Sequence, residues 1–281
     1  MGESKADAVR IEGLGYSFEA DPRRPVLDDV NLAFGENEFT AILGRNGSGK
    51  TTLLKNIAGL LRPSRGRVLV RGRDTEGMGV AEIAGQVGYV MQDSDNQLFE
   101  QTVYDEVAFA LRRPRKKRDC PEVRRKVEEA LETLGLQDRR DDFPPALCKA
   151  DRVRTVFAAV LAMGAKILIL DEPLAGQDRG GSRVIMETLD GLHRKGHTLI
   201  LVTHDIRVAA GHAGRLVVMG SGRVRLDGDP PSVFERAQEL AEAGVLLPPV
   251  ARLSRELRGR IPIRKTASSP MELALALRDL G

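Results

Sequence analysis

One stretch of the chain, residues 44–51, constrains the fold more than any other because it fits the pattern G-x-x-x-x-G-K-[ST] of a phosphate-binding loop. Residues 38–43 before it form a short apolar run suited to a buried strand, and residues 52–60 after it place apolar side chains at helical spacing. A strand, a glycine-rich loop and a helix in this order is the setting in which such a loop binds phosphate. The sequence therefore predicts an α/β protein with a phosphate-binding core.

The chemistry of the loop follows from its residue types. Glycines let backbone N–H groups curl around phosphate oxygens, and the start of the helix adds partial positive charge. Lys50 supplies a full charge, and the hydroxyl of Thr51 can bind Mg²⁺. The alternative, a glycine-rich turn with an incidental lysine, does not explain the flanking strand and helix. The candidate nucleotide-binding residues here are Gly44, Asn46, Gly47, Ser48, Gly49, Lys50, Thr51 and Thr52.

Composition narrows the class of protein. The 281 residues carry 43 Lys and Arg against 40 Asp and Glu, and this net charge of +3 gives no strong argument for nucleic-acid binding. The two cysteines, Cys120 and Cys148, have no paired spacing, which favours a reducing compartment. The polar start of the chain lacks a signal-peptide core, and no apolar run is long enough to span a bilayer. Work at a membrane would therefore need a partner chain.

Strand and helix patterns divide the chain into an α/β domain over residues 8–235, with a helical subdomain over about 93–160, and a C-terminal extension over 236–281. The first two strands predict an antiparallel β subdomain, and the near-continuous apolar strands after them predict a mostly parallel sheet covered on both faces. The predicted strands are 8–18, 26–34, 67–71, 86–91, 166–171, 197–203, 216–219 and 223–226. The predicted helices are 183–192, the stretch from 231 to about 243, 271–280 and most of 104–147.

Two acidic residues follow one of the apolar strands. Asp171 ends the run 167–171, where open α/β sheets collect their ligands, and its carboxylate could complete a Mg²⁺ shell directly or through water. Glu172 comes next and precedes a proline, so it could face a γ-phosphate and orient or deprotonate an attacking water. Adjacent acids are often solvated surface, but the wholly apolar run before this pair makes that interpretation weak.

In their order and spacing, these elements resemble the ATP-binding cassette (ABC) ATPases over residues 8–235. The segments that carry the resemblance are 44–51, Gln92, 170–173, 174–178 and 203–205. The resemblance implies a P-loop NTPase core that uses ATP and Mg²⁺. It assigns catalytic roles to Lys50, Glu172 and His204, and Mg²⁺ contacts to Thr51, Gln92 and Asp171.

Other roles rest on the same resemblance. It implies that Gln92 senses the transport partner, that Asp178 communicates across a dimer, and that His204 contacts the γ-phosphate. An aromatic residue near the N-terminus stacks on adenine in this family; Phe18 is the better positional match and Tyr16 the alternative. Without the family, both aromatics could equally be strand core, and a single histidine such as His204 is often only structural.

Within the family, residues 92–99 resemble the corresponding segment of energy-coupling-factor and cobalt or nickel importer ATPases. The extension from residue 236, with Leu247-Pro248-Pro249-Val250 and a closing helix, resembles the dimerising tail of that group.

The chain departs from the family at its signature loop, which usually reads L-S-G-G-Q. Here the aligned residues are Leu147-Cys148-Lys149-Ala150-Asp151, followed by the expected helix. The signature residues Cys148, Lys149, Ala150 and Asp151 would act in trans, on the nucleotide of a second subunit. Asp151 is also a good candidate N-cap for the helix.

We expect an ATP-hydrolysing subunit of a membrane transporter, at the cytoplasmic face of the membrane. Its expected partners are a transmembrane subunit and a second, different ABC ATPase subunit, with no nucleic acid. The function would be import of a vitamin or transition-metal ion. Two alternatives remain open: a soluble ABC-type ATPase of DNA repair or translation, and a regulatory module that binds nucleotide without hydrolysis.

Overall fold

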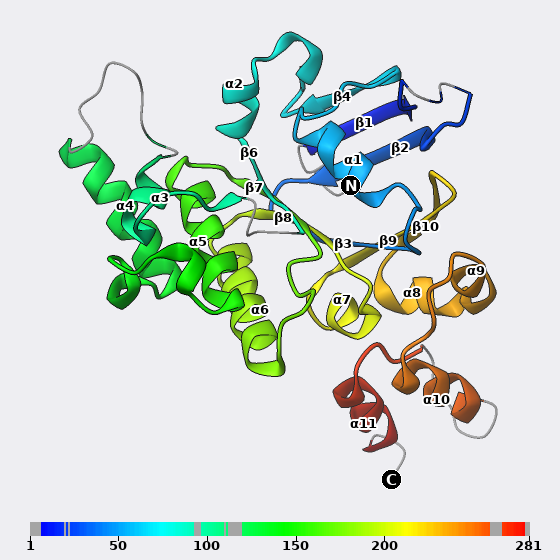
Figure 1. Cartoon of the computed structure of the whole chain (residues 1–281). Helices are drawn as coiled ribbons and strands as arrows, with labels where there is room; N and C mark the ends of the chain where they lie inside the picture. The colour runs from blue at the N-terminus through cyan, green and yellow to red at the C-terminus, as the bar shows by residue number, and fades with distance from the viewer. Residues whose placement is uncertain are drawn as a thin grey trace, which may run out of the picture. The chain divides into compact units, whose positions relative to one another are not determined.

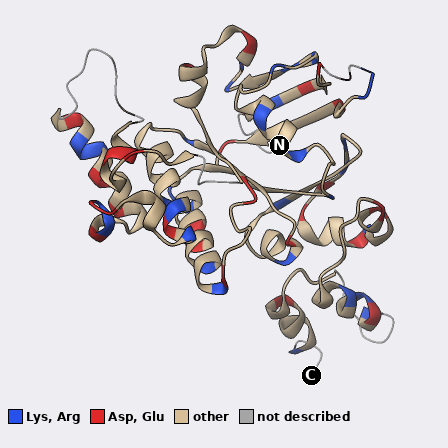
Figure 2. Ribbon diagram, viewed as in Figure 1, with Lys and Arg blue, Asp and Glu red and all other residues tan. Residues whose placement is uncertain are grey.

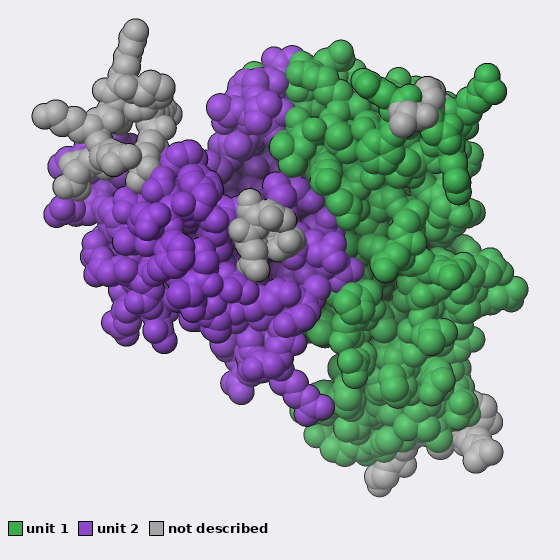
Figure 3. Space-filling view, viewed as in Figure 1, with its two compact units in different colours: residues 1–76, 200–281 green, residues 77–199 purple. Residues whose placement is uncertain are grey.

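A computed structural model of the chain describes residues 7–19, 21, 23–92, 97–109, 111, 120–258 and 266–278 (Figure 1). The chain forms two compact units, one of residues 1–76 with 200–281 and one of residues 77–199 (Figure 3). Residues 93–96 of the predicted importer-like segment and residues 279–280 of the predicted last helix lie outside the described residues. The predicted domain boundaries at 93–160 and 236 stay predictions.

The first unit contains the predicted N-terminal antiparallel sheet. Its strands are β1 (Asp7–Tyr16), β2 (Leu27–Gly35), β4 (Arg65–Val70) and β5 (Arg73–Asp74), in the order β2-β1-β4-β5. In β2 the apolar side chains Leu27, Val30, Leu32 and Phe34 are buried, while Asn31 between them is exposed. This alternation gives the sheet one buried face.

The strand before the phosphate loop, β3 (Phe39–Leu43), is buried along its whole length. It pairs in parallel with β9 (Arg215–Gly220), which pairs antiparallel with β10 (Arg223–Gly228). Strand β8 (Thr198–Val202) is equally buried. The second unit ends within this strand, at Leu199, and the first unit resumes at Ile200. Helices α1 (Lys50–Ile57) and α7 (Ile206–His212) follow β3 and β8. Burial on both faces explains why these strands read as continuous apolar runs.

Arg215 connects the elements at the start of β9. Its guanidinium donates to both carboxylate oxygens of Asp227 at 2.6 Å, to Glu38 Oε1 at 3.0 Å and to the Ala33 carbonyl at 2.7 Å. The hydrogen bonds to Asp227 raise the pKa of Arg215 above its usual value. This half-buried cation therefore links β2, β10 and the turn before β3.

The C-terminal part of the first unit is helical. It consists of α8 (Pro230–Glu235), α9 (Ala237–Glu242), α10 (Pro249–Arg258) and α11 (Pro270–Arg278). Asp229 caps α8 by accepting from the Ser232 N–H at 3.1 Å, as expected for an aspartate at that position.

The second unit contains the parallel pair β6 (Val87–Val90) and β7 (Ile167–Asp171), together with helices. The helices are α2 (Val80–Ala84), α3 (Val103–Phe109), α4 (Pro121–Leu134), α5 (Lys149–Ala162) and α6 (Arg179–Arg194). The predicted helical stretch 104–147 contains α3, α4 and two 3₁₀ turns. Helix α6 begins four residues before the prediction because Asp178 caps it, accepting from Gly181 N–H at 2.7 Å.

The α/β fold class and the antiparallel N-terminal sheet predicted from the sequence are confirmed. In the part of the chain that the structure describes, no helix is both long enough and apolar enough to cross a bilayer.

Candidate functional site

The phosphate loop joins β3 to α1 as predicted. Gly44 and Gly49 adopt φ values of 148° and 100°, which favour glycine. A Cβ at Gly44 would lie 2.3 Å from the Met219 carbonyl oxygen, and one at Gly49 would lie 2.9 Å from the Val26 carbonyl oxygen. Only glycine fits at both ends of the loop, and Asn46 and Gly47 between them are exposed.

Lys50 lies in the first turn of α1 and is buried. Its ammonium donates to the carbonyl oxygens of Gly44 at 2.8 Å and Arg45 at 3.0 Å. The charge is therefore held inside the loop, where it can exchange carbonyl partners for phosphate oxygens. Ser48 Oγ is buried with no hydrogen-bond partner among the described residues, and Thr51 is exposed.

The two candidate adenine-stacking aromatics lie together. Phe18 is beyond the end of β1, half exposed, and contacts Tyr16 edge to face with ring centroids 5.2 Å apart. The Val26 N–H donates to the Tyr16 carbonyl at 2.8 Å, and the Val26 carbonyl packs against Gly49. The aromatic pair is thus connected to the phosphate loop through a single residue, and half of Phe18 is exposed to solvent.

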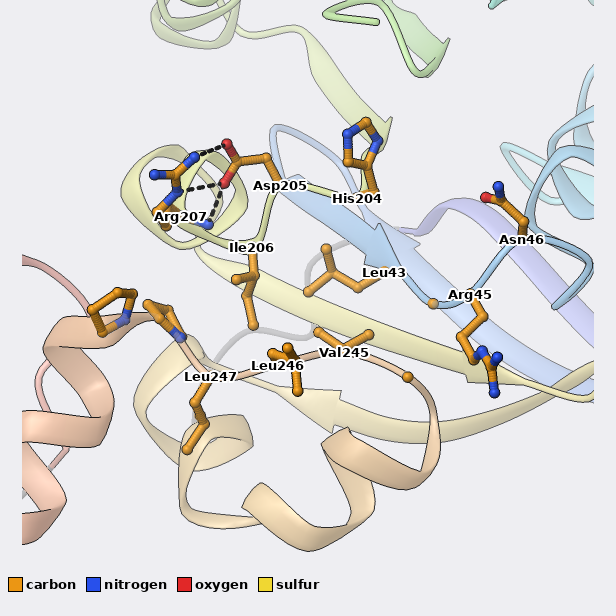
Figure 4. Close-up of a pocket in the computed structure, with 14 residues that line it drawn as sticks. Leu43, Arg45, Asn46, His204, Asp205, Ile206, Arg207, Val245, Leu246 and Leu247 are labelled. Atoms are coloured by element: carbon orange, nitrogen blue, oxygen red, sulfur yellow. Dashed lines mark hydrogen bonds and ion pairs between the residues drawn. The ribbon is translucent and has the colours of Figure 1, made fainter.

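His204 follows β8 and lines a pocket of about 560 Å³ together with residues of the phosphate loop (Figure 4). The opposite wall is formed by residues 244–248, between α9 and α10, and by Pro249 at the start of α10. Gly244 packs so closely on Arg45 that a Cβ there would lie 1.9 Å from Arg45 Cγ. The sequence singled out residues 247–250 only by resemblance to a dimerising tail. It did not predict the contact of this segment with the phosphate loop, because Gly244 and Arg45 lie 199 residues apart in the chain.

The second unit carries the two acids. Asp171 is buried at the end of β7, and its Oδ2 accepts from the Tyr89 hydroxyl at 3.2 Å. Desolvation and the nearby Asp171 raise the pKa of Tyr89, which keeps the phenol protonated as a donor. Tyr89 was not predicted, although a tyrosine in a buried strand requires a partner for its hydroxyl.

The surroundings of Asp171 show whether this residue could bind a cation. Its other oxygen, Oδ1, is buried and has no hydrogen-bond partner among the described residues. An unsatisfied buried carboxylate oxygen is costly unless a ligand completes it. This residue therefore fits Mg²⁺, which needs few protein ligands when nucleotide phosphates and water supply the rest.

Glu172 is buried and has a left-handed backbone, with φ at 51°. Residues other than glycine seldom adopt this conformation, and strained residues cluster at functional sites. The positive φ changes the direction of the chain between the end of β7 and Pro173. The carboxylates of Asp171 and Glu172 are therefore adjacent in the chain at the end of this strand.

Gln92 is exposed directly after β6. The start of its loop is fixed by Gln97, a residue of the importer-like segment 92–99 for which the sequence analysis predicted no role. Gln97 accepts from the Met91 N–H at 2.9 Å and donates to the Tyr89 carbonyl at 3.2 Å.

The signature region corrects one prediction. Asp151 is not the N-cap of α5: the helix begins at Lys149, Cys148 occupies the N-cap position without a side-chain hydrogen bond, and Asp151 lies in the first turn. Its buried carboxylate is paired with Arg154, three residues later on the same face. Arg154 also donates to the Leu134 carbonyl at 2.9 Å.

The other signature residues contact the segment that leads to α6. A Cβ at Gly176 would lie 2.6 Å from Lys149 Nζ, and one at Gly181 would lie 3.1 Å from Ala150 Cβ. Asp178, expected to communicate across a dimer, is exposed as the cap of α6. The structure thus brings Lys149 and Ala150 to the same surface as residues 174–181.

A glycine loop around a buried lysine, with a carboxylate pair at the end of a buried parallel strand, defines a P-loop nucleotide-binding protein. The family model for ABC transporters matches residues 27–175. An energy-coupling factor transporter ATP-binding protein EcfA2 of Acetivibrio thermocellus is 36% identical over 280 residues, covering 96% of this chain and 99% of that protein. The chain belongs to the ATP-binding proteins of ABC transporters, and within them to the energy-coupling-factor type.

Solved structures agree with this assignment. The chain superposes on cbiO1 from Clostridium perfringens, described as part of the ABC transporter complex cbiONQ, with a TM-score of 0.75 and 34% identity over 92% of this chain and 97% of that one. The cassette MJ0796 bound to ADP and Pi gives a TM-score of 0.69 and 26% identity over 79% of this chain and 98% of that one.

Longer relatives also match. An ABC transporter ATP-binding protein of Methanosarcina acetivorans is 40% identical over 253 residues, which cover 89% of this chain but only 40% of that protein. The chain spans about two fifths of the length of three such curated relatives, at 40%, 40% and 43%.

Proposed function

We propose that this chain is the ATP-hydrolysing subunit of an energy-coupling-factor type importer for a vitamin or a transition-metal ion. The observation that carries the proposal is the buried ammonium of Lys50, held inside a phosphate loop that only glycine can build at both ends. The likeness to EcfA2 along nearly its whole length supports the class of transporter.

The chain's own residues divide the work. Lys50 and the loop N–H groups bind the phosphates, and Phe18, or Tyr16 in its place, stacks on the adenine. Glu172 orients and deprotonates the attacking water, and His204 holds the γ-phosphate. Thr51, Gln92 and Asp171 would hold Mg²⁺, which when bound neutralises charge on the phosphates. Binding, orientation and proton transfer together make up the hydrolysis that the chain would perform.

A transmembrane subunit would convert this hydrolysis into transport. The relative cbiO1 is described as part of a complex, cbiONQ, and this supports a multisubunit transporter here. The chain would then lie at the cytoplasmic face of the membrane, bound to its partner. Substrate selection would belong to the other subunits.

The altered signature supports pairing with a different ATPase subunit. In a head-to-tail dimer each ATP lies between one phosphate loop and the partner's signature. Cys148 is a weak donor, and Lys149 and Ala150 carry side chains where glycine permits close backbone approach. The carboxylate of Asp151 is already paired with Arg154. A homodimer would have two weak sites, whereas a heterodimer whose partner has a complete signature would have one fast site.

Co-purification from native membranes tests the proposal. We expect a tagged chain to recover a membrane-spanning subunit and a second ATPase subunit, and the complex to hydrolyse ATP. Recovery of DNA or ribosomes without a membrane protein would instead assign the chain to a soluble ATPase. A recovered complex that binds ATP without turnover would make it a regulatory module.

A further inference from the structure

A second pocket, of about 340 Å³, lies in the unit of residues 77–199 beside α4, α5 and α6. None of the residues that line it belongs to the candidate nucleotide site. Its apolar lining includes the small buried residues Ala130, Ala162 and Ala165. Small side chains at these positions leave room for a compact ligand, since pockets for small molecules begin at about 300 Å³.

Basic residues surround this pocket. Lys166 and Lys195 are exposed and have no ion-pair partner in the described parts of the chain. Arg125 and Lys126 of α4 also line it, with Glu129 as the single carboxylate, which pairs with Arg125 at 2.6 Å. Lys126 pairs in turn with Glu122 of the same helix at 3.8 Å. Counting both ion pairs, the four cations and two carboxylates leave a formal charge of +2, which belongs to Lys166 and Lys195. Lys and Arg of these elements are blue in Figure 2.

A buried histidine lies in the same pocket. The Nδ1 of His197 is 3.1 Å from the Leu192 carbonyl, so Nε2 is the ring nitrogen that remains for a ligand. Burial and the nearby Lys166, with a smaller contribution from Lys195, lower the pKa of His197. The imidazole thus lies in a buried position close enough to both lysines to feel their charge.

The usual explanation of such cations is that they offset helix ends. Helices α4, α5 and α6 all end near the pocket, at Leu134, Ala162 and Arg194. Each C-terminus contributes a partial charge of about −0.5, and the three together amount to about −1.5. The formal charge of +2 on Lys166 and Lys195 exceeds this, so the helix ends alone do not balance the cluster.

We propose that this pocket binds a phosphate group, carried by a small phosphorylated molecule or a lipid headgroup, through Lys166, Lys195 and His197. Lysine is a point-charge ligand for phosphate, and the imidazole adds a donor when it takes up a proton. A bound dianion stabilises the imidazolium, so binding raises the pKa of His197 and strengthens as the pH falls.

The test is a titration of the full chain, saturated with MgADP to occupy the nucleotide site, with inorganic phosphate and then with glycerol 3-phosphate. Ring signals of the four histidines, His193, His197, His204 and His212, are followed by NMR. We expect a saturable shift and a raised pKa at His197, with His212 unchanged. In the second arm the chain is titrated with phosphatidylcholine vesicles, with and without phosphatidic acid. This arm distinguishes a phosphate on a lipid headgroup from a phosphate on a small soluble molecule.

The Lys166→Gln/Lys195→Gln double variant should weaken binding by at least about tenfold, equal to about 1.4 kcal/mol. The matched control is Arg194→Gln, which removes a neighbouring charge outside the pocket. Thermal unfolding and MgADP binding check that the variants fold. The proposal is overturned if His197 responds to neither phosphate nor acidic vesicles, or if the control loses as much affinity as the double variant.

Discussion

At the scale of single residues, the two acids at the end of β7 have different surroundings. Asp171 has one oxygen bonded to Tyr89 and one without a partner, which suits a cation ligand. Glu172 has a strained backbone at φ 51°. Strain of about 1–3 kcal/mol persists only where the surroundings enforce it. The strain therefore supports a functional reason for a glutamate at this position.

Lys50→Ala should weaken ATP binding by about 10- to 100-fold, because one charge-assisted hydrogen bond contributes about 1.5–3 kcal/mol. Equilibrium titration with a fluorescent ATP analogue measures the loss. Lys55→Ala, in the last turn of the same helix, is the matched control. If Lys50→Ala binds the analogue as tightly as the unmodified chain at physiological salt, the phosphate-loop assignment is wrong.

Glu172→Gln should leave ATP binding intact and slow hydrolysis by about 10²–10⁴-fold, since the amide keeps the shape of the side chain and loses its basicity. Single-turnover hydrolysis in the assembled complex is the measurement. A loss of less than about tenfold, below that range, would mean that another group orients and deprotonates the attacking water, and His204 would be tested next.

At the scale of elements, Glu235 at the end of α8 holds the C-terminal helices to the rest of the unit. Its carboxylate accepts from Arg258 of α10 at 2.6 and 2.9 Å and from the Thr266 hydroxyl at 2.7 Å. Arg255 also donates to the carbonyl of Glu235 at 2.8 Å. The hydrogen bonds from Arg258, followed by those from Thr266, lower the pKa of Glu235 to about 2.

Glu235→Gln should loosen α10 and α11 by about 1 kcal/mol, a value reduced for the half-exposed position of the pair. Hydrogen exchange of residues 249–258 and 270–278 measures the effect, and Glu239→Gln, from an exposed i,i+3 pair with Arg236, is the control. Because the folded-state pKa is lowered, this stabilisation is present above pH about 4.5 and is lost as the pH falls towards 2. Protection factors that are equal in both variants and do not change with pH would contradict this role.

At the scale of the whole molecule, the altered signature predicts an asymmetric dimer. Losing one preorganised donor reduces the rate by about 10²–10³-fold, and several are altered here. We expect this chain alone to hydrolyse ATP slowly. In the complex, Glu172→Gln should slow turnover by about 10²–10⁴-fold, and the same change in the partner ATPase should have little effect. Equal loss from either glutamate, or brisk hydrolysis by this chain alone, would rule out the asymmetry.

The proposed asymmetry should disappear when the signature of this chain is restored. The triple variant Cys148→Ser, Lys149→Gly, Ala150→Gly restores the donors and the space that the family signature provides. Asp151 is left unchanged because its removal would leave the half-buried Arg154 without its carboxylate. Turnover at the partner's nucleotide should rise in this variant, measured with Glu172→Gln present to silence the other site. No rise would mean that the signature residues do not limit that site.

The sequence by itself determined the features that depend on short-range pattern. The phosphate loop is a contiguous stretch whose glycines, lysine and threonine act together, and β7 is a continuous apolar run that ends in its two acids. A strand that is buried on both faces has a continuous run of apolar residues, which can be recognised in the sequence. The fold class and the positions of the candidate catalytic residues could therefore be predicted.

Only the tertiary structure decided which distant residues meet. The Tyr89–Asp171 hydrogen bond joins positions 82 residues apart and depends on the register of β6 and β7, and Gly244 packs on Arg45 across most of the chain. Asp151 was expected to cap α5, yet it pairs with Arg154 because the helix begins at Lys149, three residues earlier than that cap would place it. The basic pocket around His197 likewise draws on three helices. Such contacts are set by packing and register, for which no local spacing in the sequence provides a signal.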